Sequence, residues 1–181
     1  MRHIKLLLFP VFILCQAVFM LPACNSSGPS SGTGGESLMN AEKPGIDTAL
    51  VLDQFDLYRA KRFESIGEAL AAGPDNVYKL VLWGQKLGKI PPEIGALKYL
   101  QTLDLALNEL TRLPDEISGL HYLQGIYANG NRLKEFPPQI ILLPVLTRVD
   151  LSDNNIHKIP EYIVRMQQLT RLSMDKNAVS E

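Results

Sequence analysis

The residues of this sequence that could do acid–base chemistry are few, and their spacing does not favour a catalytic site. Asp104 and Asp150 lie two 23-residue periods apart, with Tyr127 midway between them. On strands of a parallel sheet, the two carboxylates would stand about 9.6 Å apart, which suits a general acid and a general base. Both would nevertheless lie on an open face, without the burial that shifts the pKa of catalytic carboxyl groups. We therefore expect no enzymatic activity.

The histidines and the other carboxylates do not form a metal-binding pattern. His121 and His157 fall in predicted loops, and neither has a second histidine in phase with it. The run Asp150-x-x-Asp153-Asn154 resembles a calcium-binding loop, but Asn154 is needed for a structural role. The sequence also lacks a Ser/His/Asp set, a phosphate-binding glycine loop and a CxxC motif, so we expect no metal and no cofactor.

The elements that would position these residues come from a repeat of 23 residues that runs from Val77 to the C-terminus. Residues 100–110 give its clearest copy, L-x-x-L-x-L-x-x-N-x-L. A unit this short is too small to bury its own apolar face, so successive units must stack against each other. The units begin at Val77, Leu100, Leu123, Leu146 and Leu169.

Within each unit, the alternation of apolar and polar residues predicts a short strand followed by a turn with a buried amide. Positions 1, 4 and 6 of the unit would point inward, and positions 3, 5, 7 and 8 outward. The amide at position 9 can bond to backbone groups of its own turn and of the neighbouring unit, which predicts a structural ladder. The ladder residues are Asn108, Asn131, Asn154 and Asn177, with Gln85 in the first unit.

The second half of each unit predicts a convex side without strands. The clearest copy reads Leu113-Pro114-x-x-Ile117-x-x-Leu120, and its proline excludes a central strand. This pattern resembles the leucine-rich repeat family in its 23-residue form, L-P-x-x-I-x-x-L. The resemblance covers residues 77–181, as four full units and a partial fifth. It implies an α/β fold, a right-handed leucine-rich repeat solenoid with a concave parallel sheet and an irregular or short-helical convex side.

Residues 45–76 would form a helical N-terminal cap for this solenoid. The segment 47–60 has a helical composition, and Ser65-x-x-Glu68 matches a capping box before a helix that ends near Gly73. We expect one face of this helix to cover the apolar end of the first unit. That face comprises Phe63, Ile66, Ala69 and Leu70.

The N-terminal residues predict export and lipid attachment. Residues 1–23 have a positive start and an apolar stretch, as in a signal peptide, and end in Leu21-Pro22-Ala23 before Cys24. This end resembles the bacterial lipoprotein box and implies lipidation of Cys24. Cleavage by ordinary signal peptidase, or retention as a membrane anchor, remains an alternative. Residues 24–44, rich in Ser and Gly, would be a flexible tether.

Composition narrows the class of partner. The chain has 181 residues, a formal net charge of −1 and no basic run beyond the N-terminus, which argues against nucleic-acid binding. Its only cysteines are Cys15 and Cys24, so a mature chain beginning at Cys24 would have no disulfide. Secreted animal leucine-rich repeat domains usually carry cysteine-rich caps, so the resemblance favours a bacterial envelope protein.

The outward positions of the predicted sheet are where a binding site could lie. Exposed Trp, Tyr and Arg are over-represented at binding hot spots, although Trp83 could instead pack against the N-terminal helix. Arg148 and Arg171 could hold a carboxylate or phosphate, but we expect them to pair with Asp150 and Asp175. The candidate protein-binding residues are Tyr78, Trp83, Asp104, Tyr127, Arg148, Asp150 and Arg171, and Val81 and Leu107 complete an apolar half.

These observations predict a monomeric, non-enzymatic lipoprotein of the bacterial envelope, in the outer membrane or at the surface, that binds another protein on its concave face. A secreted form would follow if Cys24 is not lipidated. A structural or adhesive envelope component, which binds by avidity without one dominant site, is a second possibility. A third is that these repeats belong to a longer protein of several domains.

Overall fold

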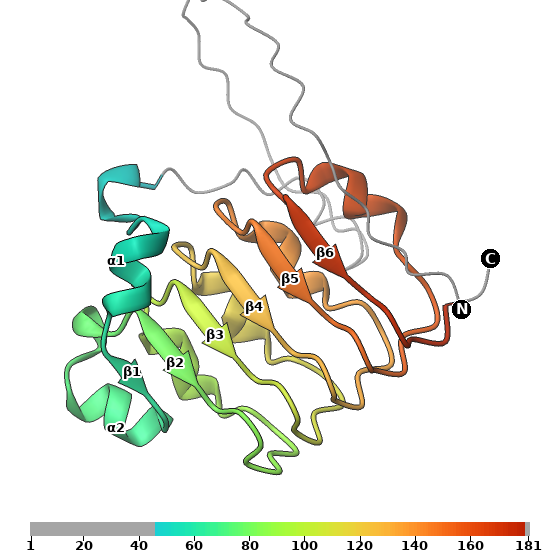
Figure 1. Ribbon diagram of the computed structural model, residues 1–181, viewed down its shortest axis with the longest axis horizontal. Helices are drawn as coiled ribbons and strands as arrows, with labels where there is room; N and C mark the ends of the chain where they lie inside the picture. Colours follow the sequence, from blue (N-terminus) through green and yellow to red (C-terminus); the bar gives the residue numbers. More distant parts are fainter. Residues whose placement is uncertain (1–45, 180–181) are drawn as a thin grey trace, which may run out of the picture. The chain divides into compact units, whose positions relative to one another are not determined.

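The structure is a computed structural model that describes residues 46–179 (Figure 1). The predicted signal peptide, the tether and Cys24 lie outside the described residues. Within 46–179, no helix combines the length and the hydropathy that crossing a membrane requires.

Six parallel strands form one sheet, in which each strand pairs with the strands before and after it in sequence (Figure 1). Residues one repeat apart lie side by side: Lys79 pairs with Thr102, and Thr102 with Gly125. The same register continues through Arg148 to Arg171. This register confirms the predicted stacking of units. The strands are β1 (Arg62–Phe63), β2 (Lys79–Val81), β3 (Thr102–Asp104), β4 (Gly125–Tyr127), β5 (Arg148–Asp150) and β6 (Arg171–Ser173).

The inward positions of the strands build one continuous apolar core. Leu80, Leu103 and Ile126 are fully buried. Since alternate residues of a strand face opposite sides, a slip of one residue would expose this entire row, so burial fixes the register. The core ends at β6, where Leu172 and Met174 are only half-buried.

Short 3-10 helices on the other side of the core form the convex side. Each follows a proline with extended backbone, such as Pro91 and Pro114, and each sends an isoleucine inward. Ile94 and Ile117 are fully buried, whereas Ile163, in the last helix, is half-buried. These helices are η3 (Pro92–Ala96), η4 (Asp115–Gly119), η5 (Pro138–Leu142) and η6 (Glu161–Arg165).

After each of the strands β2–β6, the chain turns through a residue with a positive φ angle. Gly84 and Gly130 adopt this backbone, at φ 68° and 67°, without steric cost. Leu107 adopts φ 55° at the same place, where a side chain is disfavoured. A Cβ atom on Gly130 would lie 2.5 Å from Leu107 Cδ2, so the missing side chain of Gly130 makes room for Leu107.

The predicted asparagine ladder ties each turn to its neighbours. Asn131 Oδ1 accepts a hydrogen bond from Leu110 N at 3.0 Å, and its Nδ2 donates to Leu105 O at 2.9 Å and Ala128 O at 3.1 Å. Asn131 is 6% exposed, so these bonds are closed to water. Asn108, Asn154 and Asn177 repeat the pattern. In the first unit, Gln85 Nε2 instead donates to Glu64 O in the cap at 2.7 Å.

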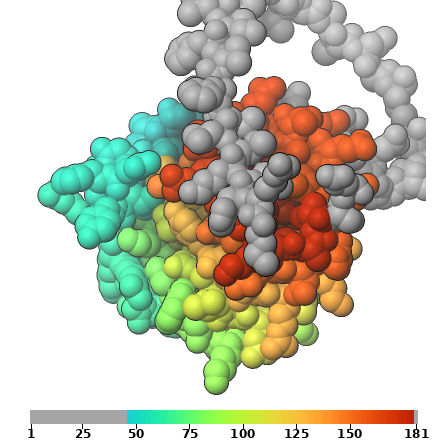
Figure 2. Space-filling view, turned by 45° about the vertical axis from the view of Figure 1, so that its right-hand side comes forward, coloured from blue at the N-terminus to red at the C-terminus, as the bar shows by residue number. Residues whose placement is uncertain are grey.

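The N-terminal cap covers the first unit at one end of the stack (Figure 2, cyan). Ser65 accepts a hydrogen bond from Glu68 N at 3.1 Å, as in a capping box. Phe63 and Ala69 are buried in the core, and Ile66 and Leu70 pack against it. The sequence did not predict that the cap contributes β1, which pairs with β2. The cap helices are η1 (Thr48–Leu50), α1 (Gln54–Arg59), α2 (Ile66–Ala71) and η2 (Pro74–Asn76).

Two glutamines fasten the start of the cap to the repeats. Gln101, which is fully buried, accepts from Leu52 N and donates to Leu50 O, each at 2.8 Å. Gln124 Nε2 donates to Leu52 O at 2.7 Å. The residues that precede α1 are therefore held across two neighbouring units, and this attachment places α1 beside the sheet.

Candidate functional site

The concave face of the sheet, opposite the 3-10 helices, carries two adjoining hollows near the cap. The first has a volume of about 280 Å³ and the second about 380 Å³. They share Val81 and Asp104, so they form one continuous surface. The first, called here the basic hollow, is lined by Gln54, Leu57, Tyr58, Lys79, Val81, Thr102, Asp104, Tyr127 and Arg148. The second, the tryptophan hollow, is lined by Arg62, Glu64, Val81, Trp83, Gln85 and Asp104.

Trp83 and Tyr127 lie on this surface in the way that the repeat predicts. Trp83 is 57% exposed, so the cap does not bury it. The ring of Tyr127 lies over Gly125, since a Cβ at Gly125 would meet its atoms at 3.4 Å. Asp104, between the two hollows, is half-buried. The sheet thus brings two aromatic rings and one carboxylate to the same surface.

Two residues predicted for the apolar half of this face expose less surface than expected. Val81 is only 8% exposed, whereas the sequence pattern places it outward. It forms the floor between the hollows, where Leu57 and Tyr58 of α1 share its surroundings. Tyr78 is half-buried and lines neither hollow. The apolar part of the face is therefore smaller than predicted, and it is concentrated at Trp83 and Leu107, the latter 48% exposed.

The predicted pairing of Arg148 and Arg171 with aspartates is wrong. Asp150 Oδ1 accepts hydrogen bonds from Ser152 N at 3.0 Å and Ser152 Oγ at 2.6 Å. Within residues 46–179, the ion pairs are Lys61–Glu68, Arg62–Glu64 and Arg132–Glu109. Arg148 Nε is buried and has no hydrogen-bond partner. Arg148 therefore lines the basic hollow without an ion-pair partner among the described residues.

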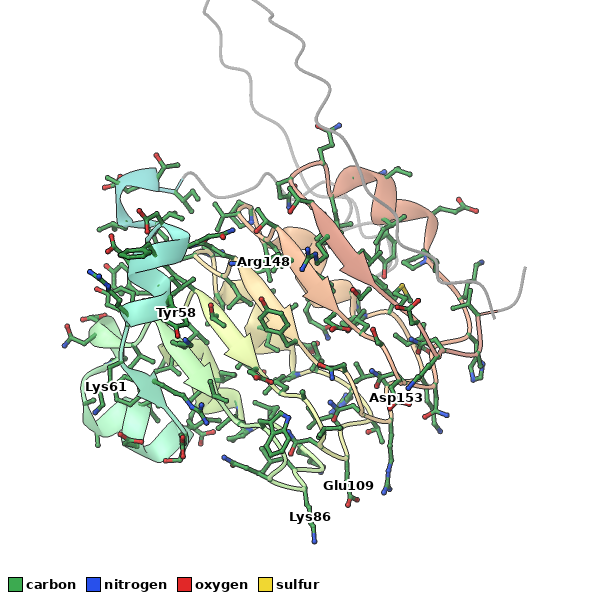
Figure 3. All side chains as sticks on the ribbon, viewed as in Figure 1. Tyr58, Lys61, Lys86, Glu109, Arg148 and Asp153 are labelled. Carbon is green, nitrogen blue, oxygen red and sulfur yellow. The ribbon has the colours of Figure 1, made fainter. Side chains whose placement is uncertain are left out.

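Sequence reasoning missed the contribution of the cap to the site. Tyr58, on α1, is 81% exposed and lines the basic hollow. Lys79 Nζ lies 5.7 Å from the centre of its ring, which is within the range of a cation–π contact. Figure 3 shows Tyr58 on α1 and Arg148 on β5 on the same side of the sheet. The repeat pattern could have placed Lys79 in this site, because Lys79 occupies the same outward position of its unit as Arg148. Tyr58 lies outside the repeat, so no pattern indicated its role.

The geometry supports binding and offers little for catalysis. Asp104 Oδ1 accepts from Ala106 N at 3.0 Å, and Asp150 makes the same kind of bond to Ser152, so both carboxylates stabilise the ends of their strands. In the described part of the chain, no three His, Cys, Asp or Glu residues come close enough together to hold a metal ion. Exposed aromatic rings, an unpaired guanidinium and shallow hollows are features of a recognition surface.

Comparisons with known proteins identify the repeat. Residues 75–133 match the model of a leucine rich repeat, and residues 145–166 match a second model of the same repeat. No curated protein sequence matches the chain.

Among solved structures, the chain resembles the BIR3–SERK2 complex from Arabidopsis thaliana, with 36% identity, a TM-score of 0.52 and 57% of each chain covered. It also resembles the leucine-rich repeat protein LIC12759 of Leptospira interrogans, with 30% identity and a TM-score of 0.49, covering 65% of this chain and 36% of that one. The chain thus spans between about a third and just over half of these proteins. Residues 75–133 and 145–166 are leucine-rich repeats, and the open six-stranded parallel sheet has the leucine-rich repeat fold.

Proposed function

We propose that this protein binds another protein through the concave face of its repeats, at the end nearest the cap. The observation that carries the proposal is the exposure of Trp83 and Tyr58 around two adjoining hollows. Leucine-rich repeats are typically protein-interaction modules, and solenoids present extended concave surfaces for this purpose. The similar BIR3–SERK2 structure is itself a complex of two proteins.

The chemistry of the surface favours a protein over a small molecule. The hollows are shallow and lie side by side, so a ligand would contact both only by extending along the strands. Large aromatic side chains lose little entropy on binding and often dominate the affinity of protein interfaces. A partner that covers Trp83 and Tyr127 would gain most of its affinity from those two rings.

A pull-down from membrane extracts with the full chain as bait tests this proposal. The double variant Trp83→Ala/Tyr127→Ala should lose capture of the partner, because hot-spot truncations cost roughly 2 kcal/mol or more each. The matched control is Tyr99→Ala/Tyr122→Ala, which removes two stacked rings that line neither hollow. Equal capture by the wild type and the Trp83/Tyr127 variant, with all proteins folded, would refute the assignment of the surface.

We further propose that the protein is displayed on the bacterial envelope as a lipoprotein anchored through Cys24. The support is the apolar N-terminal stretch, the Ala23-Cys24 junction and the Ser- and Gly-rich residues after it. Intact-mass measurement of the protein extracted from membranes tests this directly. A mass that begins at a diacylglyceryl-modified Cys24 is expected, and an unmodified chain that begins at Met1 would contradict it.

Adhesion by avidity is the second candidate, because many weak contacts could act together on a crowded surface. In that case each single alanine substitution on the concave face would change attachment only slightly, and attachment would depend on the density of the displayed protein. Comparing Trp83→Ala at high and low display density separates the two functions.

A further inference from the structure

We propose that the occupant of the two hollows is an extended segment of the partner protein, in which an acidic residue stands four positions from a large apolar residue. This inference rests on the proposed function, since it specifies what the concave face recognises. The acidic residue would lie in the basic hollow, and the apolar residue would lie against Trp83 in the tryptophan hollow.

The basic hollow is shaped and charged for one carboxylate. Its charged residues are Lys79, Arg148 and Asp104, two cations and one anion, so its net charge is positive. Asp104 is already engaged with a backbone amide, whereas Arg148 makes no ion pair within residues 46–179. A guanidinium binds a carboxylate through parallel hydrogen bonds, and the terminal amino groups of Arg148 would offer them to a carboxylate in this hollow.

The size of the basic hollow limits what can enter it. Thr102 and Gly125 lie side by side on β3 and β4, between Lys79 on β2 and Arg148 on β5. Because both are small, they leave the space that Lys79 and Arg148 border. At about 280 Å³, the hollow accommodates one or two side chains and no larger structure. The rings of Tyr58 and Tyr127 form part of its wall and would pack against the methylene groups of an acidic side chain.

The spacing between the two hollows follows from the strand. Lys79 and Trp83 are separated by four residues of extended chain, which is about 13 Å at 3.3 Å per residue. A bound segment that runs along β2 in an extended conformation covers the same distance in four residues. Val81, buried between the hollows, offers a flat apolar floor under the residues in between. An acidic residue on the Lys79 side of the basic hollow and an apolar residue four positions away would therefore reach both hollows together.

Selection from a random 12-residue peptide display library, with the full chain as bait, tests this inference. The wild type should enrich peptides with Asp or Glu four positions from Trp, Phe or Leu. The Arg148→Gln bait should lose the acidic preference and keep the apolar one, and Trp83→Ala should do the reverse. The matched control is Arg171→Gln, which removes the same charge from the same row one strand further on, outside both hollows.

Affinity measurements on one enriched peptide make the test quantitative. Arg148→Gln should weaken binding about tenfold or more, and Arg171→Gln by less than about twofold. Replacing the acidic residue of the peptide by its amide should weaken binding to the wild type equally, with no further loss on Arg148→Gln. Trp83 is the only tryptophan of the chain, so its emission reports occupancy by any peptide that lacks tryptophan.

Three outcomes would overturn the inference: no acidic enrichment, a preferred spacing other than four, or equal losses for Arg148→Gln and Arg171→Gln. Displacement of the peptide by millimolar inorganic phosphate would also overturn it, because it would indicate a general anion site. If partner capture still depends on Trp83 and Tyr127 but not on Arg148, the proposed function stands and this inference alone fails.

Discussion

Replacing Asn131 by alanine should remove a large part of the stability of the fold. Asn131 lies in the middle of the ladder, and its side chain is the hydrogen-bond partner of Leu110 N. Without Asn131, the Leu110 amide would have no other hydrogen-bond partner, because Leu110 is fully buried and closed to water. The two carbonyls that Asn131 contacts are less affected, since Asn108 also donates to Leu105 O and Asn154 also donates to Ala128 O.

The magnitude follows from these contacts. A buried amide without a partner costs about 1–3 kcal/mol, and each of the two lost bonds to carbonyls contributes about 0.5–1.5 kcal/mol. The sum is roughly 2–6 kcal/mol, which is a large share of the 5–15 kcal/mol typical of a folded domain. Asn131→Asp should cost at least as much, because a carboxylate cannot donate to the same carbonyls.

Urea unfolding followed by circular dichroism measures this loss. The matched control is Gln85→Ala, at the same position of the first unit, where the exposed side chain makes one bond to Glu64 O. That change should cost about 1 kcal/mol or less. If Asn131→Ala costs no more than Gln85→Ala, the ladder does not stabilise the stack in the way argued above.

Three further predictions follow from other contacts. Gly130→Ala should lower stability by about 1–2 kcal/mol, because alanine is strained in this left-handed backbone and its Cβ meets Leu107. Adding Leu107→Ala should remove the clash but not the backbone strain. Thermal unfolding of both variants measures the two contributions. Burial raises the pKa of Tyr162 above its usual 10.0. The native state therefore holds this proton more tightly than the unfolded state, and the free energy of unfolding should fall as pH rises through about 10 and beyond. Tyr162→Phe should make that fall less steep in urea titrations, and parallel curves would contradict the reasoning. Gln101→Ala should speed hydrogen exchange at Leu52 N by about tenfold or more, since it removes the acceptor of that amide; unchanged exchange would show that another contact holds the cap.

Periodicity explains which parts of the fold the sequence could predict. The strands, the inward leucines and the ladder asparagines recur every 23 residues, so one geometric rule places all of them, including the exposed Trp83. The cap has no period. Its strand β1 is two residues long, and the place of α1 beside the sheet depends on bonds between Gln101 and residues about fifty positions earlier.

The site was harder to predict for the same reason. Val81 has an outward position in its own unit, but α1 lies beside it, and no pattern within the repeat reports this distant contact. Tyr58 is missed because it comes from α1 itself. The pairing predicted for Arg148 failed on a local effect, since Asp150 bonds to the backbone amide and hydroxyl of Ser152, two residues on. Charge pairing inferred from neighbouring positions ignores this competition from the strand end.

The one-by-one pairing of the strands gives the molecule two unequal ends. Each unit contacts only the units next to it, so a solenoid can fray from an end that nothing covers while the rest stays folded. Among the described residues, the β1 end is closed by α2, and the β6 end has half-buried apolar side chains. The tryptophan hollow lies beside the closed end, and the basic hollow extends from α1 across the sheet to Arg148 on β5. A partner held at Trp83 would bind the part of the described fold that opens least often, whereas opening that reaches β5 would release its contact with Arg148.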